Sequence, residues 1–359
     1  MLNRFFRAGL IACLAALPCA TALAQQAPAA PAPAVVPPPP PPPASLYLDA
    51  KPLNPTLDDW PYPYPVKGFS VNIMGQPFNM AYMDVPPQPG KPDKGALVLM
   101  HGKNFAGDYW GGVAAALSAQ GYRVIIPDQI GFGRSSKPET PYHFDDLAAY
   151  TSALLDSLKI GRFHLVANSM GGMLAVRYTR LYPQRVRSLT LENPLGLEDY
   201  VPYIPPQENE TLLKLEMAQT ETSYRNFMRS YFPNWKPAFE RNVELYARVQ
   251  KGADYRRWSL ASVLSYQMIY EKPIVADLPK LEPATLLVIG QLDRTVFGRR
   301  FAPADKIKSL GNFPQLGKTA AKTIPRAELV EIENVGHVPH LEVPERFNAA
   351  LIGFVERNN

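Results

Sequence analysis

Residues 163–172 read FHLVANSMGG, a short and mostly apolar run followed by a serine and two glycines. The run predicts a buried strand, and the stretch 171–181 predicts a helix directly after it. Ser169 then lies on a tight strand-to-helix turn, where it is exposed at the sheet edge beside the free N–H groups of the helix. This arrangement predicts a nucleophilic serine next to an oxyanion site. The alternative is a serine that caps an ordinary helix.

The same alternation of apolar runs and amphipathic stretches continues along most of the chain. Residues 66–73 and 76–83 predict a hairpin of strands, and apolar runs predict strands at 97–100, 124–127, 163–167, 186–191, 285–289 and 329–332. Amphipathic spacing predicts helices at 109–119, 143–159, 171–181 and 344–356. Uninterrupted apolar strands separated by helices indicate an α/β fold with a mostly parallel sheet covered on both faces. Ligands of such sheets bind beyond the carboxyl ends of the strands.

Three segments resemble motifs of the α/β-hydrolase family. The turn 167–171 (ANSMG) resembles its nucleophile elbow, G-x-S-x-G, with a small alanine in place of the first glycine. Residues 101–104 (HGKN) are similar to the loop that supplies an oxyanion donor, and 128–135 (DQIGFGRS) matches the D-x-x-G-x-G-x-S loop. The resemblance covers 66–194 and 281–357. It implies an α/β-hydrolase fold with a helical cap inserted at 195–280.

The resemblance also implies a catalytic triad. Ser169 would be the nucleophile, Asp293 after the strand 285–289 the acid, and His337 after the last strand the base. The chain order Ser, Asp, His is that of the family. Glu192, which ends the strand 186–191, is an alternative acid, because some members of the family place theirs there.

The oxyanion hole would be formed by the backbone N–H groups of Lys103 and Met170, with Asn104 as the next candidate. Two other histidines are expected to have no catalytic role: His101 is expected to be structural, and His340 lies at the start of the next helix. The five histidines are scattered without an H-x-x-x-H pair, so we expect no metal site. Nothing in the sequence indicates a cofactor.

The segment 195–280 is the least informative part of the sequence. It holds 13 of the 38 aromatic residues. An aromatic roof over the site would exclude water and favour an apolar acyl or alkyl group. The candidate pocket residues are Asn104, Trp235, Trp258 and Arg248. The alternative is that the aromatic side chains only pack the cap helices onto the body.

The first 24 residues have the pattern of a secretory signal peptide. Arg4 and Arg7 precede an uncharged, mostly apolar stretch, 8–23, and Ala22-Leu23-Ala24 offers a cleavage site that would leave Gln25 first. The alternative is an uncleaved anchor, but the apolar stretch is shorter than the ~20 residues that span a bilayer. We expect a periplasmic or secreted bacterial protein.

Two further segments precede the predicted hydrolase core. Residues 25–44 include ten prolines and predict a stiff, solvated linker, and 45–65 predict an extended arm on the folded domain. Both cysteines, Cys13 and Cys19, lie in the signal peptide, so the mature chain is expected to contain neither a disulfide nor a thiolate metal site.

Four functions remain open. The first is an exported serine hydrolase acting on a small carboxylic ester. The second is a carbon–carbon hydrolase of the ring-fission-product type: the NSMGG elbow suits it and Arg248 could meet a substrate carboxylate, but Val338 stands where that group usually has tryptophan. The third is an aminopeptidase or amidase, which needs an acidic cap pocket. The fourth is a non-enzymatic protein that binds a ligand or the cell envelope.

The net charge argues against one class of partner, nucleic acids. The net charge is +5, and removal of the two arginines of the signal peptide leaves 5 − 2 = +3, too little to indicate a nucleic-acid partner. We expect no stable membrane span after cleavage. The proline-rich segment remains a candidate for contact with the cell envelope.

Overall fold

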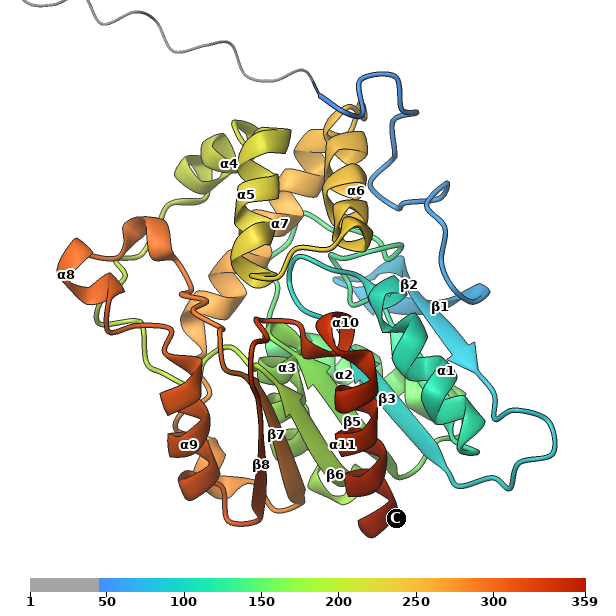
Figure 1. Cartoon of the computed structure of the whole chain (residues 1–359). Coiled ribbons are helices and arrows are strands. Elements are labelled where there is room, and N and C mark those ends of the chain that lie inside the picture. The colour runs from blue at the N-terminus through green and yellow to red at the C-terminus, as the bar shows by residue number, and fades with distance from the viewer. Residues whose placement is uncertain (1–44) are drawn as a thin grey trace, which may run out of the picture. The chain divides into compact units, whose positions relative to one another are not determined.

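The computed structural model describes residues 45–359, so the predicted signal peptide (1–24) and linker (25–44) lie outside the described residues. The strands form one eight-stranded sheet in the order β1-β2-β4-β3-β5-β6-β7-β8 (Figure 1). Their bounds are β1 Val66–Ile73, β2 Gln76–Val85, β3 Ala96–Met100, β4 Arg123–Pro127, β5 Phe163–Asn168, β6 Val186–Glu192, β7 Ala284–Gly290 and β8 Ala327–Ile332. β2 is antiparallel to β1 and β4, and all other neighbours are parallel. The predicted α/β fold is confirmed.

Helices cover both faces of the sheet. α1 (Gly111–Ala119) and α11 (Pro344–Arg357) lie side by side on one face, in front of the sheet in Figure 1. α2 (Phe144–Ser157), α3 (Met170–Leu181) and α9 (Phe313–Thr323) pack on the other face. Short helical segments complete the chain: η1 Gly107–Trp110, η2 Pro183–Arg185, η3 Pro237–Phe239, η4 Leu278–Lys280, η5 Arg299–Phe301, α8 Ala304–Ile307 and α10 Pro339–Glu342.

Strand β3 shows why the apolar runs are uninterrupted. Leu97 and Leu99 pack with the α1–α11 side of the core, whereas Val98 and Met100 pack with the α2–α3 side. All four side chains are fully buried. Because successive side chains of a strand point to opposite faces, a sheet covered on both sides needs apolar residues at every position.

Four helices lie between β6 and β7. They are α4 (Asn209–Met217), α5 (Glu221–Tyr231), α6 (Glu240–Gln250) and α7 (Tyr255–Glu271), and we call them the cap helices. In Figure 1 they lie above the edge of the sheet at which the parallel strands end. α5 begins with a capping box, in which Thr220 accepts from the Ser223 amide and Ser223 Oγ accepts from the Thr220 amide.

The arm at 45–65 lies on the body, but it is a series of turns and not one extended segment. Its amides close short turns, such as Leu57 N–H to the Asn54 carbonyl and Trp60 N–H to the Leu57 carbonyl, both 3.0 Å. The side chains of Leu53, Leu57 and Trp60 are buried. The turns follow from the local sequence: the Asn54 side chain accepts from the Asp58 amide, the interaction by which asparagine favours turns.

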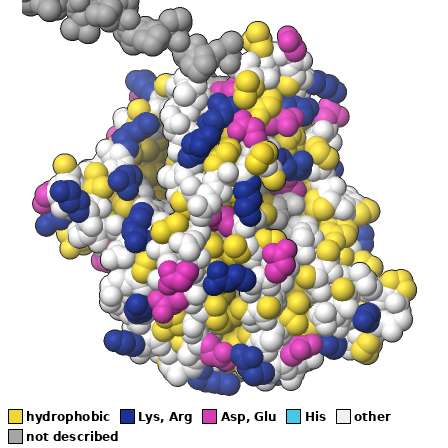
Figure 2. Space-filling model, viewed as in Figure 1, with side chains coloured by type: hydrophobic (Ala, Val, Ile, Leu, Met, Phe, Trp, Pro, Cys, Tyr) yellow, Lys and Arg dark blue, Asp and Glu magenta, His cyan; other side chains and the backbone are white. Residues whose placement is uncertain are grey.

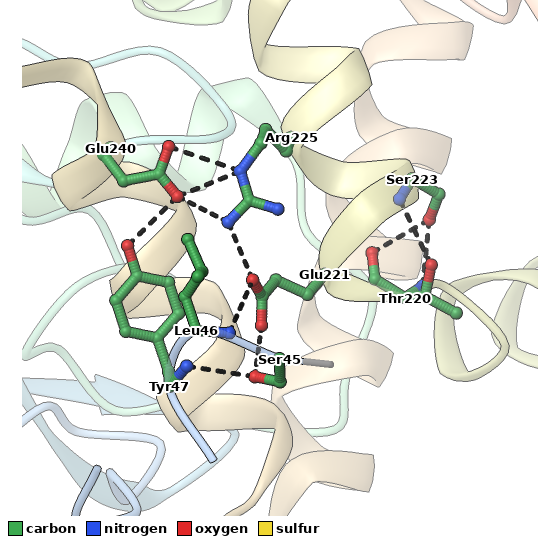
Figure 3. A network of polar contacts seen from close by, with 8 residues as sticks. All are labelled: Ser45, Leu46, Tyr47, Thr220, Glu221, Ser223, Arg225 and Glu240. Carbon is green, nitrogen blue, oxygen red and sulfur yellow. Dashed lines mark hydrogen bonds and ion pairs between the residues drawn. The ribbon is translucent and has the colours of Figure 1, made fainter. Parts of the chain in front are cut away.

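The start of the arm is tied to two cap helices (Figure 3). Ser45 Oγ and the Leu46 amide donate to Glu221 at the start of α5, and Tyr47 Oη donates to Glu240 at the start of α6. Arg225 donates to both glutamates. This network joins the arm to both helices.

The surface seen in Figure 2 carries both signs of charge, with Lys and Arg side chains interspersed among Asp and Glu. Within residues 45–359, none of the helices combines the length and the hydropathy needed to cross a membrane.

Candidate active site

Ser169 occupies the turn between β5 and α3 in a strained conformation. Its φ is 57° and its ψ −123°, a region that costs a non-glycine residue about 1–3 kcal/mol. The surroundings hold it there: its amide donates to the Glu192 carbonyl at 3.1 Å, and its carbonyl accepts from the Leu195 amide at 3.1 Å. Backbone strain of this kind at a serine is typical of a functional site.

The two glycines after the serine are required by close packing. A Cβ on Gly171 would lie 2.5 Å from the Met100 carbonyl oxygen, and one on Gly172 would lie 2.5 Å from Pro194 Cβ. Helix α3 can therefore begin against the end of β3 only with small residues. This packing brings the serine turn next to the loop that follows β3.

Asp293 and His337 meet at the carboxyl ends of β7 and β8. The Asp293 Oδ2 atom lies 2.6 Å from His337 Nδ1, and both side chains are fully buried. Gly290 permits this approach, since a Cβ there would lie 1.9 Å from the Gly336 carbonyl oxygen. Because a carboxylate only accepts, Nδ1 carries the proton and Nε2 of the neutral ring is left as an acceptor. Among the described residues His337 Nε2 has no hydrogen-bond partner.

The charge on Asp293 is stabilised by its partners. Burial opposes the ionised form, but the His337 imidazole and the bond from the Thr295 amide together hold the pKa of Asp293 below its usual value. The Thr295 amide donates at 2.8 Å and Asn193 Nδ2 at 2.5 Å. An ionised acid is what orients the imidazole and stabilises an imidazolium.

Asn193 is a site residue that the sequence analysis missed. Its Nδ2 binds Asp293, its Oδ1 accepts from the Gly290 amide at 3.0 Å, and its φ is 39°. It thus ties the acid to the strand that carries it. The available signal was its position directly after β6, where polar residues of a parallel sheet face the site.

Asn168, next to the serine, connects the three loops of the site. Its Nδ2 donates to the carbonyls of His337 (3.1 Å) and Glu192 (3.2 Å). Its Oδ1 accepts from Tyr109 Oη at 3.2 Å, and that hydroxyl in turn accepts from the Gly102 amide at 3.0 Å. The serine turn, the histidine loop and the loop after β3 are therefore joined by one buried amide.

The two predicted oxyanion donors remain free. Within the described chain, neither the Lys103 nor the Met170 amide donates a hydrogen bond. Gly102 lies against the serine, since a Cβ on it would lie 3.1 Å from Ser169 Cβ. These amides are available to an oxygen atom bound beside the serine.

The other polar candidates have structural partners. His101 Nε2 accepts from the Gln129 amide at 3.0 Å, as expected of a structural histidine. Glu192 binds His340, with its two oxygens 2.7 Å from the amide and from Nδ1 of that residue. The structure therefore brings Asp293, and not Glu192, to His337. In residues 45–359 no three His, Cys, Asp or Glu side chains form a potential metal site.

A cavity of about 60 Å³ lies between the loop after β3, the arm and the cap helices. Two of the four predicted pocket residues line it, Asn104 and Trp258, and so does Lys103, which carries a predicted oxyanion amide. Leu57 of the arm and Glu216 of α4 also line it, and the sequence analysis predicted neither.

The other two predicted pocket residues, Trp235 and Arg248, do not line this cavity. Trp235 packs inside the cap against Phe232, with ring centroids 6.3 Å apart, and beneath the Arg229 guanidinium. Arg248 faces the arm and donates to the Lys51 carbonyl at 2.9 Å and to Glu244 at 3.0 Å. The reason is the same in both cases: the sequence placed these residues in the cap without showing which side of it faces the cavity.

Comparisons with known proteins agree with the fold. Residues 95–344 match the family model of the alpha/beta hydrolase fold. Lipase 1 of Psychrobacter immobilis is 28% identical over 68% of this chain and 72% of its own length. The 2-hydroxy-6-oxononadienedioate/2-hydroxy-6-oxononatrienedioate hydrolase of Burkholderia vietnamiensis is 28% identical over 73% of this chain and 87% of its own length.

A solved structure is closer than these relatives. The crystal structure of a probable hydrolytic enzyme from Pseudomonas aeruginosa PAO1 is 40% identical and superposes with a TM-score of 0.82. The match covers 85% of this chain and 98% of that chain. The family model spans more than half of this chain, and the relatives are hydrolases. The chain therefore belongs to the alpha/beta hydrolase fold family, and it is a hydrolase.

Proposed function

We propose that the chain is an exported serine hydrolase that cleaves a carboxylic ester through an acyl-enzyme on Ser169. The observation that carries the proposal is the buried 2.6 Å contact between His337 and Asp293, which leaves His337 Nε2 unpartnered in the described chain. This nitrogen is the atom that a general base needs for the serine proton. Ser169 lies on a strained turn, and the neighbouring Asn168 side chain ties this turn to the His337 carbonyl.

The proposed reaction has two halves. Ser169 Oγ attacks the ester carbonyl carbon while its proton passes to His337 Nε2, and the oxyanion formed faces the amides of Lys103 and Met170. The imidazolium returns the proton to the departing alkoxide, which leaves as an alcohol. Water then attacks the acyl-enzyme in the same way and releases the acid. Each oxyanion donor is worth about 3–4 kcal/mol in the transition state.

The cavity next to the loop after β3 favours a substrate with an apolar group, although Ser169 and His337 are not among its lining residues. Leu57, Phe132 and Trp258 contribute apolar walls, and the charged residues of the lining are Lys103, Asp108 and Glu216. Apolar walls with a few polar groups are typical of small-molecule sites. The lipase relative is consistent with an ester substrate.

Labelling with a fluorophosphonate tests the nucleophile. We expect one adduct, on Ser169, that is lost in Ser169→Ala and strongly reduced in His337→Ala. The exposed His143→Ala serves as the control and should label like the wild type. An adduct that persists in Ser169→Ala would show that another serine is the nucleophile.

A carbon–carbon hydrolase is the second candidate, favoured by the relative from Burkholderia vietnamiensis. The position of Arg248 removes one argument for it, because this guanidinium binds the arm. Turnover of p-nitrophenyl esters compared with a dienoate diketone decides between the two. An aminoacyl amide belongs in the same panel, because Glu216 gives the cavity the cap carboxylate that an aminopeptidase or amidase needs.

Export is proposed from the first 24 residues alone. Mass spectrometry of the mature protein from the periplasm should find Gln25 first, and an intact Met1 there would contradict cleavage. The proline-rich segment 25–44 is proposed as a spacer that also permits contact with the cell envelope.

A further inference from the structure

The loop after β3 is held from above by the cap helices. Lys103 Nζ donates to Ser262 Oγ on α7 at 2.7 Å, and Asn104 Nδ2 donates to Tyr231 Oη on α5 at 3.0 Å. Lys103 carries one of the two free amides of the site. Two consecutive side chains of this core loop therefore depend on the cap for their position.

Tyr231 also contacts the histidine loop. Its carbonyl accepts from the His337 amide at 2.9 Å. Its ring lies against the imidazole, with centroids 4.5 Å apart and planes inclined by 37°. A Cβ on Gly336 would lie 2.3 Å from the Tyr231 carbonyl oxygen, so the two segments meet at backbone distance. Tyr231 is itself buried.

The position of Tyr231 in its helix explains why its carbonyl is free to accept from the His337 amide. It is the last residue of α5, and the final carbonyls of a helix have no partner inside the helix. The amide of His337 supplies that partner. The end of a cap helix and the residue proposed as the base thus satisfy each other's hydrogen bonds, and the tyrosine ring and hydroxyl are fixed between them.

We propose that Tyr231 is a positioning residue. Through it the cap fixes the position of the loop after β3, which carries Lys103 and Asn104, relative to the loop that carries His337. The inference rests on the proposed function, because it assigns the Lys103 amide to the oxyanion. Misplacement of a reacting group by about 1 Å can cost about 100-fold in rate, so a link of this kind matters even without substrate contact. The cap then completes the site as well as covering it.

Tyr231→Phe tests the link, because it removes the hydroxyl and keeps the ring and the backbone. We expect kcat for a p-nitrophenyl ester to fall about five- to tenfold, with KM changed less than about twofold, as for loss of one hydrogen bond that acts on the transition state. Asn104→Ala should lower kcat by a similar factor. The double variant should be no slower than either single variant, since both remove the same link.

Tyr255→Phe is the matched control. It removes another buried cap hydroxyl, which donates to the Glu216 carbonyl at 3.0 Å and has no contact with the catalytic loops. We expect it to lower the melting temperature and leave kcat unchanged. A change of kcat in this control equal to that in Tyr231→Phe would overturn the proposal, because it would reflect general loosening of the cap.

The rate at which a fluorophosphonate labels Ser169 gives a second readout that needs no ester substrate. Slower labelling of both Tyr231→Phe and Asn104→Ala supports the link. Wild-type labelling rates in either variant, or additive losses in the double variant, overturn it. If the wild type is labelled but turns over no ester, the ester proposal fails while the labelling rates still decide the role of Tyr231.

Discussion

Glu342 shows how a side chain outside the proposed triad supports the base. Its Oε1 accepts from the Gly336 amide at 2.8 Å, one residue before His337, whereas its Oε2 is buried and has no partner in the described chain. Burial, which outweighs the Gly336 bond, raises the pKa of Glu342 to about 7. The folded protein therefore holds a proton that the unfolded chain releases at its ordinary carboxyl pKa.

The raised pKa of Glu342 makes the stability of the folded protein depend on pH. Between the ordinary carboxyl pKa and about 7 the folded state binds more protons at Glu342, so its contribution to stability falls as the pH rises through this window. Glu342→Gln removes the titration and keeps an oxygen for the Gly336 amide. We expect the free energy of unfolding of Glu342→Gln, relative to the wild type, to be higher at pH 8 than at pH 5.

Urea denaturation at the two pH values measures this difference. Glu345→Gln, at an exposed position of the same segment, is the control. Its free energy of unfolding should differ from that of the wild type by the same amount at pH 5 and at pH 8. A Glu342→Gln difference that does not change with pH would show that this carboxyl titrates alike in the folded and unfolded states.

At the scale of elements, the arm contributes to the stability of the fold although it contains no regular helix or strand. Trp60 is 2% exposed, its Nε1 donates to Asp108 Oδ2 at 3.0 Å, and the Arg241 guanidinium lies 4.3 Å from the centre of its ring. Arg241 belongs to α6 and Asp108 to η1. One side chain of the arm thus joins the cap to the core.

Trp60→Ala should therefore destabilise the whole protein. We expect a loss of about 3–5 kcal/mol in the free energy of unfolding, as for other large buried aromatic residues. Leu48→Ala, at a residue of the same arm that is 69% exposed, should change it by less than about 0.5 kcal/mol. Urea denaturation compares them, and equal effects of the two substitutions would refute a structural role for the arm.

The regular elements could be predicted because their signal is local. Every strand was predicted to within two residues, and the signal is strongest for the central strands β3, β5 and β7, whose apolar runs are buried on both faces. Helix α9 was not predicted: it contains Gly317, a poor helix former, which packs so closely that a Cβ there would lie 2.7 Å from the Ile289 side chain. The requirement comes from β7, more than twenty residues away, and a local pattern does not contain it.

The site residues also differ in whether a local sequence pattern indicates them. Ser169, Asp293 and His337 come after predicted strands, which places them at one sheet edge, and the resemblance to the family supplied their expected roles. Asn193 also follows a strand and was overlooked, whereas Tyr231 lies in a cap helix and meets His337 through a contact about a hundred residues distant that no strand-end pattern contains. The sequence indicates which residues end the strands but not which cap side chains reach them.

At the scale of the whole molecule, the arm, sheet and cap share their apolar clusters. One cluster contains Trp60 of the arm, Leu97 of β3, Phe232 after α5 and Phe347 of α11. The other joins the cap helix α7 to the far face of the sheet. Because no apolar cluster belongs to the cap alone within the described residues, opening the cap exposes apolar surface on both sides.

We therefore expect the cap and the sheet to unfold in one transition, although chains of this size often unfold through intermediates. The four tryptophans report on different parts: Trp60 on the arm, Trp110 on η1, and Trp235 and Trp258 on the cap. Urea curves from tryptophan fluorescence, far-ultraviolet circular dichroism and enzymatic activity should have the same midpoint. A loss of activity and fluorescence at lower urea than the loss of helix signal would show that the cap opens first, and the shared clusters would then be too weak to couple it to the sheet.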